Sequence, residues 1–264
     1  MDAPSARTEG LEDLRAVRRG SRHHADGPVI GASALARLCG LPAENDGWED
    51  VPEHERAELT RDGWFSASGD LGPRGSELRR GLGGHHTVLA LRARDTTGLR
   101  RGWVIVGDEL AVTVLEEGIA TAADAPQGQV AFEVGPANSL PIVLAKWGGL
   151  DPTWNYDTAH ELKDASLVQR RVSDASTGAP EGADQKLLEL WGRDWTLWSI
   201  TSPEAGVNLE FIAIGEQGHY IVRTRTDGAT VLAPRPGSLV WGDLQMISTM
   251  LPGQPERSDD GEDW

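Results

Sequence analysis

Alternating apolar and polar positions occur in two parts of the chain, and each part predicts four antiparallel strands followed by a helix. The first part contains the predicted strands TVLALRA, RRGWVIV, ELAVTVL and QVAFEV and the predicted helix SLPIVLAKWGGL. The second part contains the strands WTLWSI, VNLEFIAIG, HYIVRTR and ATVLAP and the helix LVWGDLQMISTML. Short glycine-containing links such as Gly107-Asp108 favour hairpins between neighbouring strands. The pattern therefore predicts an α+β fold.

The two parts also match each other residue by residue. At a constant spacing of 108 positions, the matched pairs are Gly84 with Gly192, Leu89 with Leu197, Gly98 with Gly206, Trp103 with Phe211, Val106 with Ile214 and Gly107 with Gly215. At a spacing of about 99, Ser139 matches Ser238 and Leu140 matches Leu239. Glycines at equal spacing indicate equivalent turns, because glycine adopts backbone angles that other residues avoid. Two ordinary meanders can match by chance, but we favour an internal duplication that gives two pseudo-symmetric lobes, each an antiparallel β-meander with flanking helices.

Composition along the chain suggests the limits of these lobes. We expect a first lobe over residues 29–150 and a second over 151–251. The polar stretches 1–28 and 252–264 are expected to be a disordered arm and a disordered acidic tail. A short helix is predicted near Leu35 with Ser33 as its N-cap, and a longer one over residues 159–172 (AHELKDASLVQRRV).

The charge of the chain excludes several classes of partner. A formal net charge of −16 disfavours nucleic acids and anionic membranes, because both bind concentrated basic surfaces. Cys39 is the single cysteine, so an intramolecular disulfide and a cysteine-based metal cluster are excluded. The sequence has no long apolar run, and we expect a cytoplasmic protein. Its ten tryptophans should lie mostly in the core, but their number raises the chance of an exposed aromatic contact surface.

No stretch of the sequence carries a recognised catalytic pattern. GLGGHH at 81–86 is glycine-rich, but it precedes a predicted strand, whereas phosphate-binding loops follow a strand and open a helix. A metal or nucleophilic site would require several of His85, His86, His160 and Cys39 to converge in the fold. We therefore expect a protein that is not an enzyme and that uses no cofactor and no metal.

The layout of the chain resembles the EspG family of actinobacterial ESX (type VII) secretion-associated proteins. The resemblance spans most of residues 29–251 and depends on three stretches. These are a leucine-rich helix ending in Gly40-Leu41-Pro42, the segment DGWFSASGDLGPRGSELRRGL before the strand TVLALRA, and GEQGHYIVRTRTDGATVLAP before the closing helix. The resemblance implies a two-lobed α+β fold with pseudo-twofold symmetry. It also implies a cytosolic, non-enzymatic chaperone that grips the helical tip of a PPE protein within a PE–PPE heterodimer.

By position, the resemblance also implies two groups of partner-binding residues. The first group is a loop between two strands of the first lobe: Asp95, Thr96, Thr97, Gly98 and Leu99. The second group lies in the closing helix: Trp241, Leu244, Gln245 and Met246. Two alternatives remain open on the sequence alone, an immunity protein whose negative charge attracts a cationic toxin and an uncharacterised enzyme.

Overall fold

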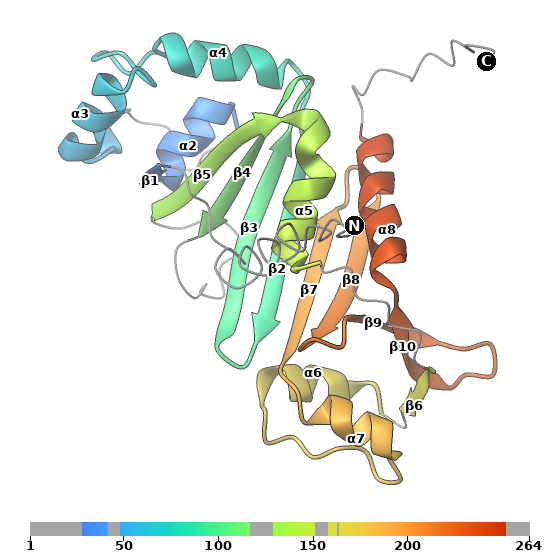
Figure 1. The fold of residues 1–264 in the computed structure, drawn as a ribbon. Helices are drawn as coiled ribbons and strands as arrows, with labels where there is room; N and C mark the ends of the chain where they lie inside the picture. Colours follow the sequence, from blue (N-terminus) through green and yellow to red (C-terminus); the bar gives the residue numbers. More distant parts are fainter. Residues whose placement is uncertain (1–27, 42–47, 117–128, 151–157, 163, 252–264) are drawn as a thin grey trace, which may run out of the picture.

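The protein is described from a computed structural model, over residues 28–41, 48–116, 129–150, 158–162 and 164–251 (Figure 1). Most of the expected arm and the whole expected tail lie outside these residues. Ten strands of the described chain form one sheet with antiparallel pairing, in the order β1-β5-β4-β3-β2-β7-β8-β9-β10-β6. The strands are β1 (Val29–Gly31), β2 (Thr87–Asp95), β3 (Gly98–Val106), β4 (Leu110–Glu116), β5 (Gln129–Pro136), β6 (His160–Leu162), β7 (Trp195–Ser202), β8 (Val207–Ile214), β9 (His219–Thr224) and β10 (Thr230–Arg235).

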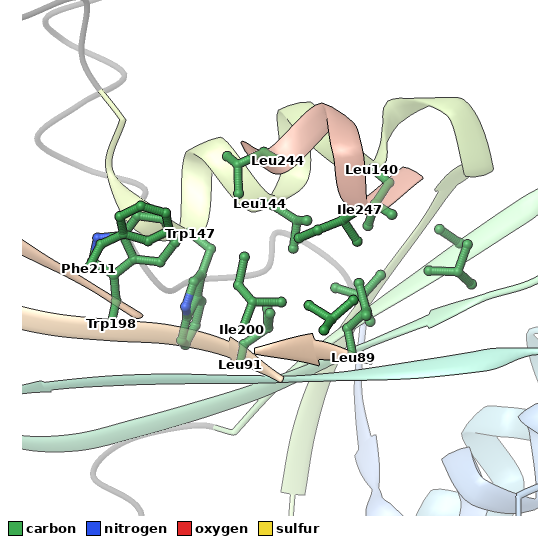
Figure 2. Packing of buried hydrophobic residues seen from close by; sticks show 14 of the residues in the cluster. Leu89, Leu91, Leu140, Leu144, Trp147, Trp198, Ile200, Phe211, Leu244 and Ile247 are labelled. Atoms are coloured by element: carbon green, nitrogen blue, oxygen red, sulfur yellow. The ribbon is translucent and has the colours of Figure 1, made fainter. Parts of the chain in front are cut away.

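Helices cover both faces of this sheet. They are α2 (Ala32–Cys39), α3 (Glu53–Arg61), α4 (Pro73–Leu82), α5 (Leu140–Gly148), α6 (Ser166–Ser173), α7 (Gln185–Trp191) and α8 (Gly237–Met250), with short 3₁₀ helices at Trp48–Asp50 and Ala137–Ser139. Helices α5 and α8 pack beside each other on one face, called here the α5/α8 face (Figure 2). The opposite face carries α2 and α4 over the first half of the sheet and α6 and α7 over the second half. The α+β class predicted from the sequence is confirmed.

The two halves of the chain contribute to one continuous sheet. The first half supplies β1 to β5 and the second half β6 to β10, and the two halves meet where β2 pairs with β7. Within each half, an edge strand and helices precede a four-stranded meander, and a helix on the α5/α8 face follows it. This repeated order is compatible with an internal duplication, which itself stays a prediction.

The residue matches that suggested the duplication are wrong in detail. Leu89 lies in the core beneath α5 and α8, whereas its proposed match Leu197 packs on the opposite face. The pairs Val106 with Ile214 and Trp103 with Phe211 are likewise divided between the two faces. Side chains alternate across a strand, so an error of one residue moves every match to the wrong face. A spacing of 109 would instead match Leu89 with Trp198 and Leu91 with Ile200, which all lie in the α5/α8 core.

A similar one-residue error affects the helices. In α5 the buried positions include Leu140 and Leu144, and in α8 they include Val240 and Leu244. A spacing of 100 would match Leu140 with the buried Val240, whereas its predicted match Leu239 is 49% exposed. The Ser-Leu dipeptide misled the match because identical residues occupy helical positions that are 100° apart.

Three apolar clusters hold the layers together. The largest lies between the sheet and the α5–α8 pair, and it mixes residues from both halves, such as Leu91 and Ile200 (Figure 2). Each of the other two clusters lies on the opposite face under the helices of its own half. Six of the eight described tryptophans are buried, and the other two, Trp103 and Trp241, are partly buried. The described tryptophans therefore mostly serve the cores, as expected.

Two local predictions need correction. Residues 159–172 do not form one helix, because His160–Leu162 pairs with β10 as an edge strand before α6 begins at Ser166. Strand pairing here overrides the helical spacing of the leucines. The N-cap of α2 is Gly31 and not Ser33, and the buried Glu55 accepts a hydrogen bond from the Gly31 amide.

Candidate functional site

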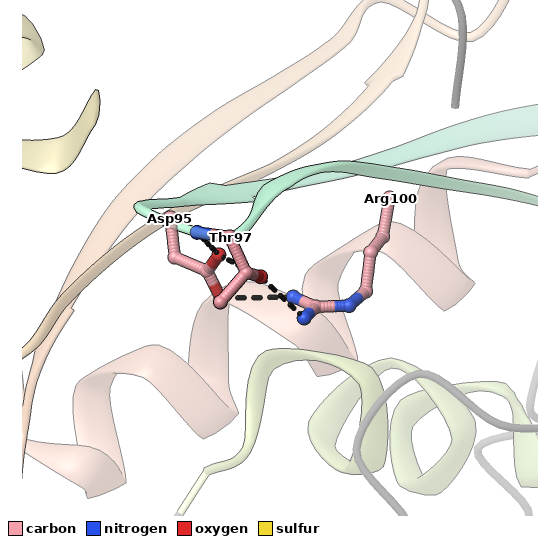
Figure 3. A network of polar contacts seen from close by, with 3 residues as sticks. All are labelled: Asp95, Thr97 and Arg100. Carbon is pink, nitrogen blue, oxygen red and sulfur yellow. Dashed lines mark hydrogen bonds and ion pairs between the residues drawn. The ribbon is translucent and has the colours of Figure 1, made fainter. Parts of the chain in front are cut away.

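The first predicted contact group forms a tight hairpin between β2 and β3. Asp95 pairs with Gly98, which leaves Thr96 and Thr97 as a two-residue turn with both side chains exposed. One Asp95 carboxylate oxygen accepts hydrogen bonds from the Thr97 amide (2.7 Å) and the Thr97 hydroxyl (2.5 Å). The other oxygen accepts one from the Arg100 guanidinium at 2.9 Å (Figure 3). The tip is therefore a tight turn held by its own hydrogen bonds.

The ionisation of Asp95 reflects these contacts. Partial burial acts to raise the pKa of Asp95, but hydrogen bonds from Arg100 and Thr97 outweigh it and hold the pKa below its ordinary value. Arg100 is itself fixed by a second hydrogen bond, from its guanidinium to the Thr97 hydroxyl at 2.8 Å. The charged groups of Asp95 and Arg100 are thus hydrogen-bonded within the hairpin itself.

The second predicted group, on α8, is only partly accessible. Gln245 and Met246 are exposed, and Trp241 is partly buried. Leu244 is fully buried against the sheet and α5, so a partner could not reach it without a change in the position of α8, and its predicted contact stays untested. Its heptad-like spacing from Val240 and Ile247 places it on the core side of the helix. Leu239 and Met250 add exposed apolar surface to the other side.

The structure does not bring the two predicted groups together. Leu99 pairs with Arg94, and Arg94 pairs with Leu197, so their side chains lie on the face opposite α5 and α8. Met246 belongs to α8 on the other side of the sheet. One compact partner surface therefore cannot use both Leu99 and Met246.

A third group of residues, absent from the sequence-based prediction, surrounds Leu99 on the opposite face. A hollow of about 220 Å³ lies between the centre of the sheet and α6, and its lining residues are Arg92, Arg94, Leu99, Gln169, Leu197, Ser199 and Glu210. We call these seven residues the central strip. They lie between the two clusters that cover the outer parts of this face. The arginines of the strand RARD were visible in the sequence, but nothing there showed that the described helices leave a hollow on their face.

A second hollow, of about 410 Å³, lies near the end of α2 and includes Arg79 and Asp70 in its lining. The guanidinium of Arg79 donates hydrogen bonds to the carbonyl oxygens of Leu38 (3.1 Å) and Arg37 (2.5 Å). Arg79 thus closes the C-terminal end of α2, where carbonyl groups lack partners within the helix. A structural role accounts for its position.

The residues considered for catalysis or metal binding remain apart. Cys39 is buried under the helices of the first half, and burial raises the pKa of its thiol to about 12. His160 is buried at the far edge of the sheet, 3.3 Å from a carboxylate oxygen of Asp184. None of Cys39, His85, His86 and His160 lines either hollow. Over the described residues, no group of three or more His, Cys, Asp or Glu side chains could hold a metal ion.

Comparisons with known proteins add no assignment. No protein-family model matches the chain, and no curated protein matches it. None of the helices in the described ranges combines the length and hydropathy needed to cross a membrane. Membership of the EspG family therefore stays a prediction from the sequence.

Proposed function

We propose that the protein is a non-enzymatic adaptor that binds the tip of a helical client, in the manner of the EspG-family chaperones of ESX secretion. The client would be a secreted PE/PPE-like heterodimer, held in the cytoplasm before export. The observation that carries the proposal is the hollow of the central strip beside the β2–β3 hairpin, in which Leu99 belongs both to the predicted contact loop and to the lining of the hollow.

The central strip suits a protein partner better than a small molecule. Its floor is formed by β2, β3, β7 and β8 in the middle of a ten-stranded sheet, and Gln169 of α6 lines its side. Apolar Leu99 and Leu197 alternate there with polar side chains, as in the mixed centre of many transient interfaces. A client tip seated in the hollow would also contact the exposed Thr96 and Thr97, and it would be withdrawn from self-association by mass action.

Co-expression with the helical secreted proteins encoded beside its gene tests this function. We expect one of them to co-elute with the protein as a stable complex in size-exclusion chromatography. If none forms a complex, the adaptor function is contradicted.

Two matched substitutions then decide which face is used. Leu99→Asp places a charge in the central strip, and Met246→Asp places the same charge on α8. We expect Leu99→Asp to abolish the complex and Met246→Asp to leave it intact, with circular dichroism confirming that both variants fold. The reverse result would show that the client binds to α8, and it would contradict the proposed binding at the central strip.

A further inference from the structure

Strand β8 has an open edge inside the sheet. It pairs with β7 along its whole length, but its pairing with β9 is limited to Ile212 with Tyr220 and Ala213 with His219. Beyond these two pairs β9 continues along β10 alone. In the part of the chain that the structure describes, residues 207–211 of β8 therefore pair with no strand on the β9 side.

The neighbouring turn shows which backbone groups point to this open edge. The Ile214 amide donates a hydrogen bond to the Gly218 carbonyl oxygen at 3.0 Å, so the polar groups of Ile214 point towards β9. Successive residues of an antiparallel strand direct their amide and carbonyl groups to opposite edges. Those of Asn208 and Glu210 therefore also point to the β9 side, where none of the described residues hydrogen-bonds to them.

The two ends of the described sheet offer less backbone than this internal edge. The outermost strands, β1 and β6, have three residues each, and short edge strands limit pairing with another chain. Residues 207–211 are longer than either, contain no proline and belong to a strand fixed by β7. Asn208 and Glu210 are exposed, so another chain can reach this edge.

Side chains next to the open edge differ between the two faces of the sheet. Leu209 of β8 and Ile221 of β9 are partly buried and pack at the border of the α5/α8 core. Glu210 lies on the opposite face, is exposed and forms no ion pair with the described residues. An added strand would complement this edge with apolar residues beside Leu209 and a basic residue beside Glu210.

We propose that the open edge of β8 binds an extended segment of a partner protein, which adds to the sheet as an antiparallel strand along residues 207–211. Its sequence would alternate apolar with polar residues and place a basic residue opposite Glu210. Backbone hydrogen bonds supply the affinity of such strand addition, and the alternate side chains supply its specificity. This inference does not depend on the helical client of the proposed function.

Antiparallel pairing links the backbone and side-chain requirements. A residue directly opposite Glu210 exchanges two backbone hydrogen bonds with it and directs its side chain to the same face. The polar and basic residues of the segment therefore bond to β8. Its apolar residues extend towards the α5/α8 core, and their amides point away from β8.

The test uses a peptide with this pattern, fluorescein-labelled Val-Thr-Val-Lys-Val-Thr-Val. Two analogues carry three N-methyl groups each, one on the threonines and the lysine and the other on three valines. All are titrated with the full-length protein at about 150 mM salt and followed by fluorescence anisotropy. The three peptides have equal charge, so general attraction to a protein of net charge −16 is the same for each.

We expect the unmethylated peptide to bind. Methylation of the threonines and the lysine should weaken binding at least about tenfold, because it removes the donors that face β8. Methylation of the valines should weaken it less than about threefold. Absence of binding by the unmethylated peptide, or equal loss in the two analogues, would overturn the inference.

A substitution in β8 removes the matching donor of the protein. Asn208→Pro deletes an amide that points away from β7, so the β7–β8 pairing keeps its hydrogen bonds. We expect about fivefold weaker peptide binding in Asn208→Pro, whereas Asn208→Ala retains the amide and should bind like wild type. Equal loss in the two variants would assign the effect to the side chain and contradict backbone pairing.

Circular dichroism shows whether both variants fold. If Asn208→Pro does not, the methylated analogues still decide the inference. A peptide-free wild type that is dimeric, with a monomeric Asn208→Pro, would show that a second copy of the chain occupies the edge, and it would overturn binding of a partner segment. The titration contains no helical client, so these results are separate from the co-expression test of the adaptor function.

Discussion

At the scale of single residues, Asp95 has the most clearly defined electrostatic role. Its pKa is lower in the folded protein than the ordinary value of 3.8, so the stabilisation is present above that pH and is lost as the pH falls through the folded-state pKa. We expect Asp95→Ala to lower the free energy of unfolding at pH 7 by about 1 kcal/mol. The difference from wild type should shrink as the pH falls below about 4 in urea titrations.

The control for Asp95 is Glu216, an exposed acid in the turn between β8 and β9 that makes no hydrogen bond or ion pair within the described part of the chain. Glu216→Ala should change the free energy of unfolding by less than about 0.5 kcal/mol at either pH. A loss in Asp95→Ala that persists unchanged at pH 2.5 would mean that packing, and not the charge, supports the hairpin.

At the scale of elements, α7 depends on a buried arginine from α6. The Arg171 guanidinium donates hydrogen bonds to the carbonyl oxygens of Trp191 (2.9 and 3.0 Å) and Arg193 (2.5 Å) at the end of α7. We expect Arg171→Met to lower the free energy of unfolding by about 2–4 kcal/mol, because buried carbonyls lose their donors. Its neighbour Arg170 is exposed and pairs with Asp164, so Arg170→Met should cost below about 0.5 kcal/mol in the same denaturation assay. Similar losses in both variants would contradict this role.

The same scale shows what the sequence could and could not specify. All eight strands of the two meanders, and helices α5 and α8, were predicted, because alternation and glycine spacing are local signals. The sequence did not predict which side chains of each strand point towards α5 and α8. Both faces of β2 and β7 are partly covered, so neither face is purely polar. Turn length adds to the error, since the β2–β3 turn has two residues and the β7–β8 turn spans 203–206.

The candidate site was harder to predict than the fold for a related reason. Thr96, Thr97 and Leu99 were identified through the resemblance, and the structure places them at or beside the central strip. Arg92 lies within the predicted strand TVLALRA and Arg94 directly after it, and neither was proposed as a site residue. Whether a polar strand face meets solvent, a helix or a partner depends on helices distant in the sequence, here α4 and α6. Local patterns carry no information about that coverage.

At the scale of the whole molecule, the two halves are tied by packing across their boundary. Gly148, the last residue of α5, lies against the Trp198 ring of β7, and a Cβ atom there would come within 2.6 Å of the ring. His219 of β9 contacts the Gly148 carbonyl oxygen at 3.2 Å and the Trp198 ring edge-on. The first half thus ends directly on the core of the second, and neither half has a complete core alone.

This junction predicts that Gly148→Ala destabilises the whole protein. The new methyl group must displace the Trp198 ring, and overpacking of this kind costs about 1–3 kcal/mol. Gly242 in α8 has open space around its Cβ position, so Gly242→Ala should instead gain about 0.5–1 kcal/mol from helix propensity. Calorimetry should show one unfolding transition for the wild type and for both variants, moved down by Gly148→Ala and up by Gly242→Ala. Two separate transitions, with only one affected by Gly148→Ala, would mean that the halves fold as independent units despite their shared sheet.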